Sequence, residues 1–140
     1  MNTDLFNMEP MRYWAPTSSM SSETKRQHLE QMANSGEYIW SQKYDGNWSR
    51  AVITPNHSAL QTRGISKKTG TYGEIQNKVF FWEDIAQAFE NDTVILGEVY
   101  LPGGIDKDVG SILRCLDPKA QARQKDKKLE WRIFDILYLD

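Results

Sequence analysis

The segment Lys43-Tyr44-Asp45-Gly46 holds an amine and a carboxylate that could perform chemistry together. On an extended chain alternate side chains point to the same face, so Lys43 and Asp45 are expected to share a small site, with Gly46 permitting a tight turn beside them. A lysine attacks a phosphorus atom only as the neutral amine, which burial, a metal ion or nearby cations favour. The segment therefore predicts a nucleophile. Its alternative interpretation is an exposed Lys–Asp pair at a hairpin turn, which contributes almost nothing to stability.

Strands are expected on both sides of this segment, because the flanking residues are aromatic and β-branched. Residues 38–40 lead into Lys43, and residues 48–54 are expected to pair with them as the second strand of a hairpin. Lys43 would then lie near the turn of this hairpin, at a buried strand position. Residues 59–62 predict a further short strand, which ends at a basic loop marked by glycines.

The rest of the chain alternates helical and extended patterns. Helices are expected at residues 21–34, capped by Ser21 or Ser22, and at residues 80–89, 109–116 and 118–127. Further strands are expected at residues 93–101 and 129–139. Several strands with interspersed helices predict the α+β class.

Length and composition limit the class of protein. A chain of 140 residues has room for one domain, and 39% hydrophobic with 26% charged residues is ordinary for a globular protein. Residues 1–20 show no sustained period and no secretory pattern, so they are expected to form a leader in a protein that is cytoplasmic, not secreted. The single cysteine, Cys115, fits a reducing compartment. The net charge of −2 leaves nucleic acid open as a partner, because clusters of cations matter more than the total.

Three further segments follow Lys43-Tyr44-Asp45-Gly46 in order. They are Thr62-Arg63-Gly64, Leu96-Gly97-Glu98 and Arg132-Ile133-Phe134-Asp135-Ile136-Leu137. In this order and spacing the four segments, which cover about 100 residues, resemble the covalent nucleotidyltransferase superfamily that contains the ATP-dependent DNA ligases. The resemblance implies an antiparallel-sheet nucleotidyltransferase, or adenylation, domain that is similar to the ATP-grasp ligases.

The resemblance also implies a reaction. Lys43 would attack the α-phosphorus of ATP, expel pyrophosphate and hold AMP as a phosphoramidate, while Mg²⁺ neutralises the phosphates. AMP would then pass to the 5′-phosphate of nicked double-stranded DNA. Attack by the adjacent 3′-hydroxyl seals the nick, which is a step of DNA replication, repair and recombination.

The resemblance gives the nucleotide pocket its other members. Asp45 and Glu98 are expected to contact the ribose or the metal, and Gly46 is expected to line the same pocket. Glu98 lies on an aliphatic strand, where an unpartnered carboxylate would be costly to bury. Phe134 is expected to stack on adenine, although a core position is the simpler interpretation of this residue alone.

A cationic cluster is expected to bind phosphate and nucleic acid. Arg63 presents a planar fork of donors that suits phosphate oxygens, and the resemblance places it on the nucleotide or on the 5′-phosphate. Lys67 and Lys68 follow closely and would add nonspecific attraction to the nucleic-acid backbone. Each of the three is otherwise an ordinary loop cation.

The sequence departs from the family pattern at two positions. The family has arginine five positions after the lysine, where this chain has Trp48, and aspartate before the glycine–glutamate pair, where it has Leu96. Arg50 lies on the same strand face as Trp48 and is the expected replacement for the missing arginine. The family glutamate is present as Glu98.

The family pattern also extends further than this chain. Residues 1–20 are expected to be a leader and residues 21–140 a partial adenylation domain, truncated before its last strands and without the oligonucleotide-binding-fold domain. The missing C-terminal half of the domain would be a partner, supplied in cis or in trans. The fragment alone is not expected to complete the reaction cycle.

Two alternatives remain open at this point. An RNA ligase or a capping guanylyltransferase uses the same lysine, and the nucleotide that becomes attached to Lys43 distinguishes them. A catalytically inactive remnant that binds nucleic acid is the second alternative, which Trp48 favours. Such a remnant would show salt-sensitive DNA binding and would form no adenylate.

Overall fold

The computed structural model describes residues 4–8, 17–38 and 42–140, and it divides the chain into two compact units. One unit, Met1–Met8 with Lys43–Asp140, contains the sheet, and the other is Glu9–Gln42. The expected division into a leader, residues 1–20, and a partial adenylation domain, residues 21–140, stays a prediction.

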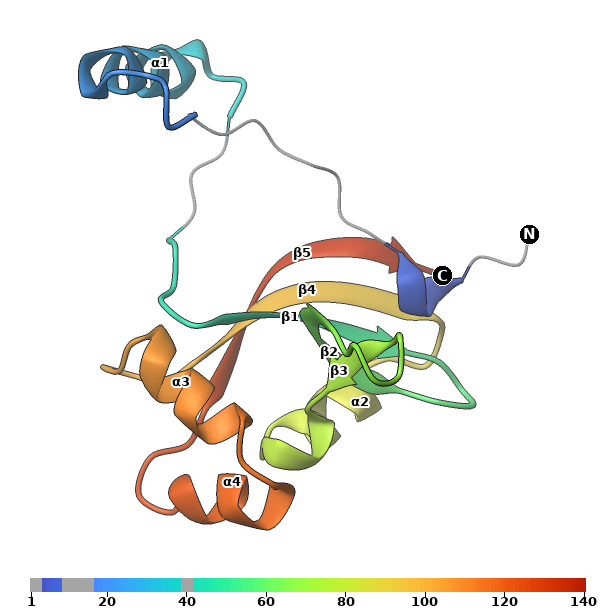
Figure 1. Ribbon diagram of the computed structural model, residues 1–140. Helices are drawn as coiled ribbons and strands as arrows, with labels where there is room; N and C mark the ends of the chain where they lie inside the picture. The colour runs from blue at the N-terminus through green and yellow to red at the C-terminus, as the bar shows by residue number, and fades with distance from the viewer. Residues whose placement is uncertain (1–3, 9–16, 39–41) are drawn as a thin grey trace. The chain divides into compact units, whose positions relative to one another are not determined.

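The sheet unit is built on five strands. They are β1 (Asn47–Ile53), β2 (Ala59–Ile65), β3 (Tyr72–Glu74), β4 (Thr93–Tyr100) and β5 (Glu130–Leu139). Their order across the sheet is β3-β2-β1-β4-β5, and every neighbouring pair is antiparallel (Figure 1). The predicted α+β class and the antiparallel sheet are therefore confirmed.

Short helices complete this unit. They are η1 (Leu5–Asn7), η2 (Gln76–Lys78), α2 (Trp82–Gln87), α3 (Asp106–Leu113) and α4 (Asp117–Arg123). Figure 1 shows α2, α3 and α4 on the same side of the sheet. None of the helices in the described part of the chain is long and apolar enough to cross a membrane.

The other unit contains α1 (Ser22–Ser35), which confirms the helix predicted at residues 21–34. The side chain of Ser21 accepts a hydrogen bond from the Thr24 amide and caps the first turn. The helix ends at Gly36, whose φ of 73° is a left-handed conformation that glycine adopts without strain.

The two faces of the sheet differ in what covers them. Ala51, Leu60 and Val99 point to one face and form the main core with residues of the helices, among them Trp82 and Val109. We call this side the helix face. Because side chains alternate along a strand, the neighbouring positions point to the opposite side, which we call the open face.

Only one end of the open face is covered by the described residues. There Leu5 of η1 packs on Val52 and Val94, which lie opposite each other in β1 and β4. The remainder of this face carries polar and aromatic side chains, and it includes three of the four sequence segments that could perform chemistry.

A tight contact on the helix face fixes β5 against β4. The indole of Trp131 lies directly over Gly97 and donates a hydrogen bond of 2.7 Å to the hydroxyl of Ser49. A Cβ atom at Gly97 would lie 2.3 Å from the Nε1 atom of Trp131, so only glycine allows this approach. The glycine of Leu96-Gly97-Glu98 therefore has a packing role.

Several local expectations are corrected. Lys43 does not lie in a hairpin: β1 pairs with β2 and β4, and Lys43 precedes β1 in an irregular segment. Residues 39 and 40 of the expected first strand lie outside the described residues. The glycine-marked loop contains a short strand, β3, which has only three residues and too weak a pattern to be recognised.

Candidate functional site

A row of side chains crosses the open face, on the part of the sheet that η1 does not cover. Glu98 of β4 lies opposite Trp48 of β1 on one side and opposite Arg132 of β5 on the other. The guanidinium of Arg63, from β2, lies 5.3 Å from the centre of the Trp48 ring. We call Arg63, Trp48, Glu98 and Arg132 the open row.

Glu98 is at the centre of this row and is half-buried. Its carboxylate accepts a hydrogen bond from the backbone N–H of Gly46. At this point the segment before β1 approaches β4 closely: a Cβ atom at Gly46 would lie 2.2 Å from the carbonyl oxygen of Val99. Gly46 has no positive φ, so the glycine is needed for this approach to β4 and not for the expected tight turn.

The pKa of Glu98 reports which charges surround it. Partial burial raises this pKa above its ordinary value of 4.5, and the Gly46 amide and the cations Lys43 and Arg63 oppose that rise. The neighbouring carboxylate of Asp45 raises the pKa further. Lys43, Asp45 and Arg63 therefore lie within electrostatic range of Glu98, and four predicted site residues from three separate segments gather at one place.

The environment of Lys43 differs from the expected one. A buried strand position was the expectation, whereas Lys43 and Asp45 are both exposed and lie before the start of β1. Burial by the described residues is thus not what would prepare the amine for attack. The remaining influences are neighbouring charges and a bound ligand.

Phe134 is not brought into the open row. It lies at a bulge of β5, where Leu96 pairs with Asp135 and Gly97 pairs with Ile133, and its side chain is 51% exposed. Among the described residues its ring makes no aromatic or cation–π contact.

Two tyrosines supply aromatic surface beside Glu98 instead. The rings of Tyr44 and Tyr100 lie 4.9 Å apart, and the guanidinium of Arg132 is 5.7 Å from the first ring and 5.4 Å from the second. This cluster was not predicted from the sequence. Its signal was available, since Tyr100 lies two residues after Glu98 on the same strand and must share its face.

Hydrogen bonds hold the tyrosine cluster in place. Arg132 donates to the hydroxyl of Tyr100 at 2.8 Å and to the carboxylate of Glu130 at 3.1 Å. The Tyr100 hydroxyl donates to the same carboxylate at 2.5 Å, and this bond raises the pKa of Tyr100 above its ordinary value. The guanidinium is thus oriented by groups on two strands, beside Glu98.

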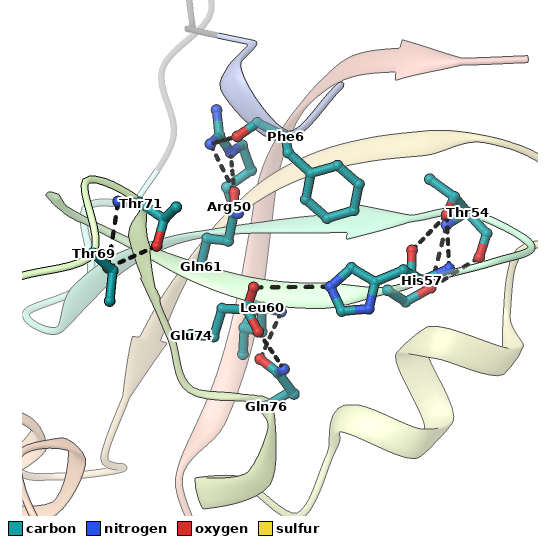
Figure 2. A network of polar contacts seen from close by, with 11 residues as sticks. Phe6, Arg50, Thr54, His57, Leu60, Gln61, Thr69, Thr71, Glu74 and Gln76 are labelled. Atoms are coloured by element: carbon teal, nitrogen blue, oxygen red, sulfur yellow. Dashed lines mark hydrogen bonds and ion pairs between the residues drawn. The ribbon is translucent and has the colours of Figure 1, made fainter. Parts of the chain in front are cut away.

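Arg50 does not replace the arginine that is missing at Trp48. It shares the open face with Trp48, but only 1% of it is exposed, and its guanidinium donates to the backbone carbonyls of Met8 and Phe6 and to the side chain of Gln61 (Figure 2). A cation–π contact of 4.5 Å with the Tyr72 ring covers it further. Arg50 therefore fastens the N-terminal segment to the sheet and is not available to a ribose.

The two expected nucleic-acid lysines lie away from the strands. Lys67 and Lys68 are exposed in the turn between β2 and β3. This turn is closed by hydrogen bonds from the Ser66 amide to the Thr71 carbonyl and from the Gly70 amide to the Ser66 carbonyl, each of 2.8 Å. Lys67 and Lys68 therefore belong to the same β2–β3 hairpin as Arg63.

The carboxylates of the open face are few. The described residues contain no group of three or more histidine, cysteine, aspartate or glutamate side chains that could hold a metal ion. Asp45 and Glu98 form a pair, and Mg²⁺ in phosphate-transfer sites commonly uses one or two carboxylates and takes its other ligands from phosphate oxygens and water. The pair therefore fits a magnesium ion that binds together with a nucleotide, and does not fit a site built by protein ligands alone.

Comparison with known proteins adds no assignment: no protein-family model matches the chain, and neither does any curated protein. The amine of Lys43, the carboxylate of Asp45 and the guanidinium of Arg63 surround the half-buried Glu98, and the tilted rings of Tyr44 and Tyr100 lie beside it. Such a site suits a ligand that has both a planar ring and phosphates.

Proposed function

We propose that this chain is the nucleotide-binding part of an ATP-dependent DNA ligase and that Lys43 carries the nucleotide. The observation that supports the proposal best is the gathering of Lys43, Asp45 and Arg63 around Glu98. These residues come from three of the four segments that resemble the ligases, and nothing in a purely structural role requires an exposed amine at this position.

The proposed chemistry follows from the types of side chain. The neutral amine of Lys43 attacks the α-phosphorus of ATP, a P–N bond forms, and the bond from the α-phosphorus to the bridging oxygen breaks. Pyrophosphate leaves with the electron pair of that bond, and the amine loses its proton to solvent. AMP is transferred next to the 5′-phosphate of nicked DNA, and the 3′-hydroxyl then displaces AMP and seals the nick.

Each neighbour of Lys43 has a role in this proposal. Arg63 offers its fork to phosphate oxygens, and the Trp48 ring beneath it holds the guanidinium in one orientation. Asp45 and Glu98 would hold Mg²⁺, which supplies charge neutralisation at the phosphates. Tyr44 follows the lysine directly and its ring packs on Tyr100, so it is a candidate for stacking on adenine inside the site, whereas Phe134, the candidate from the resemblance, lies outside the open row.

The outer strand of the sheet supports the proposed partner segment. β5 is a ten-residue edge strand that exposes Ile133, Ile136 and Leu139 at 50%, 53% and 62%. Long apolar edges of this kind normally pair with another strand, because unpaired edges promote aggregation. We propose that the strands of the C-terminal half of the domain, in cis or in trans, add to this edge.

The proposal is tested by incubation with ATP labelled at the α-phosphate and Mg²⁺, both of the 140-residue chain and of a longer protein that continues past Asp140. Label is expected on Lys43 in the longer protein, and Lys43→Ala and Lys43→Arg should both abolish it. Lys119→Ala removes an exposed lysine of α4 and is the matched control, which should label normally.

The same experiment separates the rival functions. Label from GTP in place of ATP would favour a capping-type enzyme, and AMP transfer to RNA ends alone would favour an RNA ligase. If the longer protein binds DNA in a salt-sensitive way but takes up no label from either nucleotide, the enzymatic proposal is wrong and a nucleic-acid-binding remnant is the better description.

A further inference from the structure

A groove adjoins the open row, and the proposed adenylation chemistry uses only the part of it that Arg63 and Trp48 line. It has a volume of about 540 Å³ and lies between the hairpin of β2 and β3, the start of β1 and the end of α3. Gly46, Trp48 and Arg63 line one part of it, and Lys78 and Arg114 line another. Because Trp48 and Arg63 also belong to the open row, the groove begins at the proposed nucleotide site.

The charge of the groove favours an anion. Arg63, Lys78 and Arg114 are cations from three different elements, and Glu74 is the one acidic residue among the residues that line it. Glu74 is already engaged: its carboxylate accepts from Gln76 at 2.9 Å and lies 3.8 Å from His57 (Figure 2). The lining therefore has an excess of positive charge.

The cations are positioned by neighbouring backbone. The amine of Lys78 donates to the carbonyl of Leu113 at 2.8 Å and retains further N–H donors, while its contact with Asp117 is 4.0 Å long. Arg114 follows the last turn of α3 and lies against Gly110, where a Cβ atom would be 2.9 Å from Nη2. Glycine at this position lets the guanidinium lie close to the helix.

The groove is also open at its floor. Four glycines line it, at positions 46, 64, 73 and 110, and at Gly64 an added Cβ atom would meet nothing within 4 Å, so that part of the groove is open. Cations spread along a groove, and not gathered at one point, suit a chain of phosphates better than a single phosphate.

We propose that this groove binds the sugar–phosphate backbone of the DNA strand that carries the 5′-phosphate, with Lys78 and Arg114 extending the contact that Arg63 begins. The inference rests on the proposed function, since it describes how the partner of the same site is held. Contacts of this kind fix the register of the nucleic acid without reading its sequence.

The test measures binding of a fluorescent nicked duplex with a 5′-phosphate, by anisotropy at several salt concentrations. Arg114→Gln removes an exposed cation of the groove, and Lys119→Gln removes an exposed cation of α4 outside it. At about 0.1 M salt Arg114→Gln should bind roughly 5- to 10-fold more weakly, with a salt slope smaller by about 0.9, and the control should be unchanged.

A second variant guards against loss of folding. Arg114→Lys keeps the charge and should recover most of the affinity and the salt slope, which a merely structural role of the guanidinium would not predict. If Arg114→Gln binds the duplex as tightly as the control does, the groove is not the path of the DNA. If it instead weakens binding of a non-hydrolysable ATP analogue and spares the duplex, the groove serves the nucleotide phosphates and the inference is wrong.

The two proposals fail in different ways. Label on Lys43 together with unchanged duplex binding by Arg114→Gln overturns the groove assignment and leaves the proposed enzyme intact. Absence of label together with weakened duplex binding overturns the enzyme and leaves the groove as a nucleic-acid site.

Discussion

The two ends of the open face differ in how their polar groups are satisfied. At the end covered by η1, the guanidinium of Arg50 donates to two backbone carbonyls and to the side chain of Gln61. Two residues earlier on the same strand face, Trp48 and its neighbour Arg63 are only partly covered, and Glu98 is held by one amide and surrounded by charges. The polar groups at the first end bind other parts of the protein, whereas those at the second end leave donors and acceptors for a ligand.

The largest effect on stability is expected at the end of the open face that η1 covers. Arg50→Ala removes the donor to the Met8 and Phe6 carbonyls and to Gln61, so the free energy of unfolding should fall by about 3 kcal/mol or more. Trp48→Ala, on the same strand face, should cost about 1 kcal/mol. Urea unfolding of both variants measures the difference.

A conservative variant sharpens this first prediction. Arg50→Lys keeps the charge, but a single amine does not reach both carbonyls and the Gln61 side chain, so most of the loss should remain. Equal stability of Arg50→Ala and Trp48→Ala would mean that the two ends of the open face do not differ in this way.

The next effect concerns the glycines that bring segments together. Gly97→Ala would place a Cβ atom 2.3 Å from the Trp131 indole, and the shift it forces should cost about 1–3 kcal/mol. Gly64→Ala is the matched control, because Gly64 has no atom within 4 Å of an added Cβ and no positive φ. Thermal unfolding should separate the two variants; similar melting temperatures would argue against the close packing of β4 and β5.

The smallest effect on stability is expected at the end that η1 leaves uncovered. There the pKa of Glu98 decides whether a substitution raises or lowers the free energy of unfolding. The folded protein raises the pKa of Glu98 above 4.5, so the folded state binds its proton more tightly and stability falls as pH rises through the raised value. Glu98→Gln should therefore match or exceed the native stability at pH 7, by less than about 1 kcal/mol because solvent screens a half-exposed group.

The pH dependence checks this sign. The difference in unfolding free energy between Glu98→Gln and the native protein should shrink below the ordinary pKa, where Glu98 is protonated in both the folded and the unfolded states. A variant that is less stable at pH 7 than at pH 4, relative to the native protein, would show that the carboxylate stabilises the fold. Nucleotide labelling of Lys43 should be lost in this variant whatever its stability.

Much of the sheet was predictable because the patterns of β1, β4 and β5 are long. Residues 48–54, 93–101 and 129–139 were expected as strands, and all three are strands within one or two residues. Pairing was not predictable: the expected hairpin joined residues 38–40 to β1, whereas β1 pairs with β2 and β4. Local pattern specifies that a strand exists, and the choice of partner depends on contacts between distant segments.

The sequence predicted which residues belong to the candidate site, but it did not predict how they are arranged. Lys43, Asp45, Arg63 and Glu98 do gather, yet Lys43 is exposed and Phe134 lies at a bulge that shifts the register of β5. Bulges and side-chain burial arise from tertiary packing, which the sequence pattern does not encode. The prediction that Arg50 replaces the arginine missing at Trp48 was wrong for the same reason. The carbonyl groups that bind Arg50 belong to residues more than forty positions away in the sequence.

The central claim, that the charges of three segments surround Glu98, is tested most directly by NMR titration of the Glu98 carboxyl carbon. The pKa of Glu98 should lie above 4.5 in the native protein, rise further in Lys43→Met and in Arg63→Met, and fall in Asp45→Asn. A pKa of Glu98 at its ordinary value that none of the three substitutions changes would contradict the account.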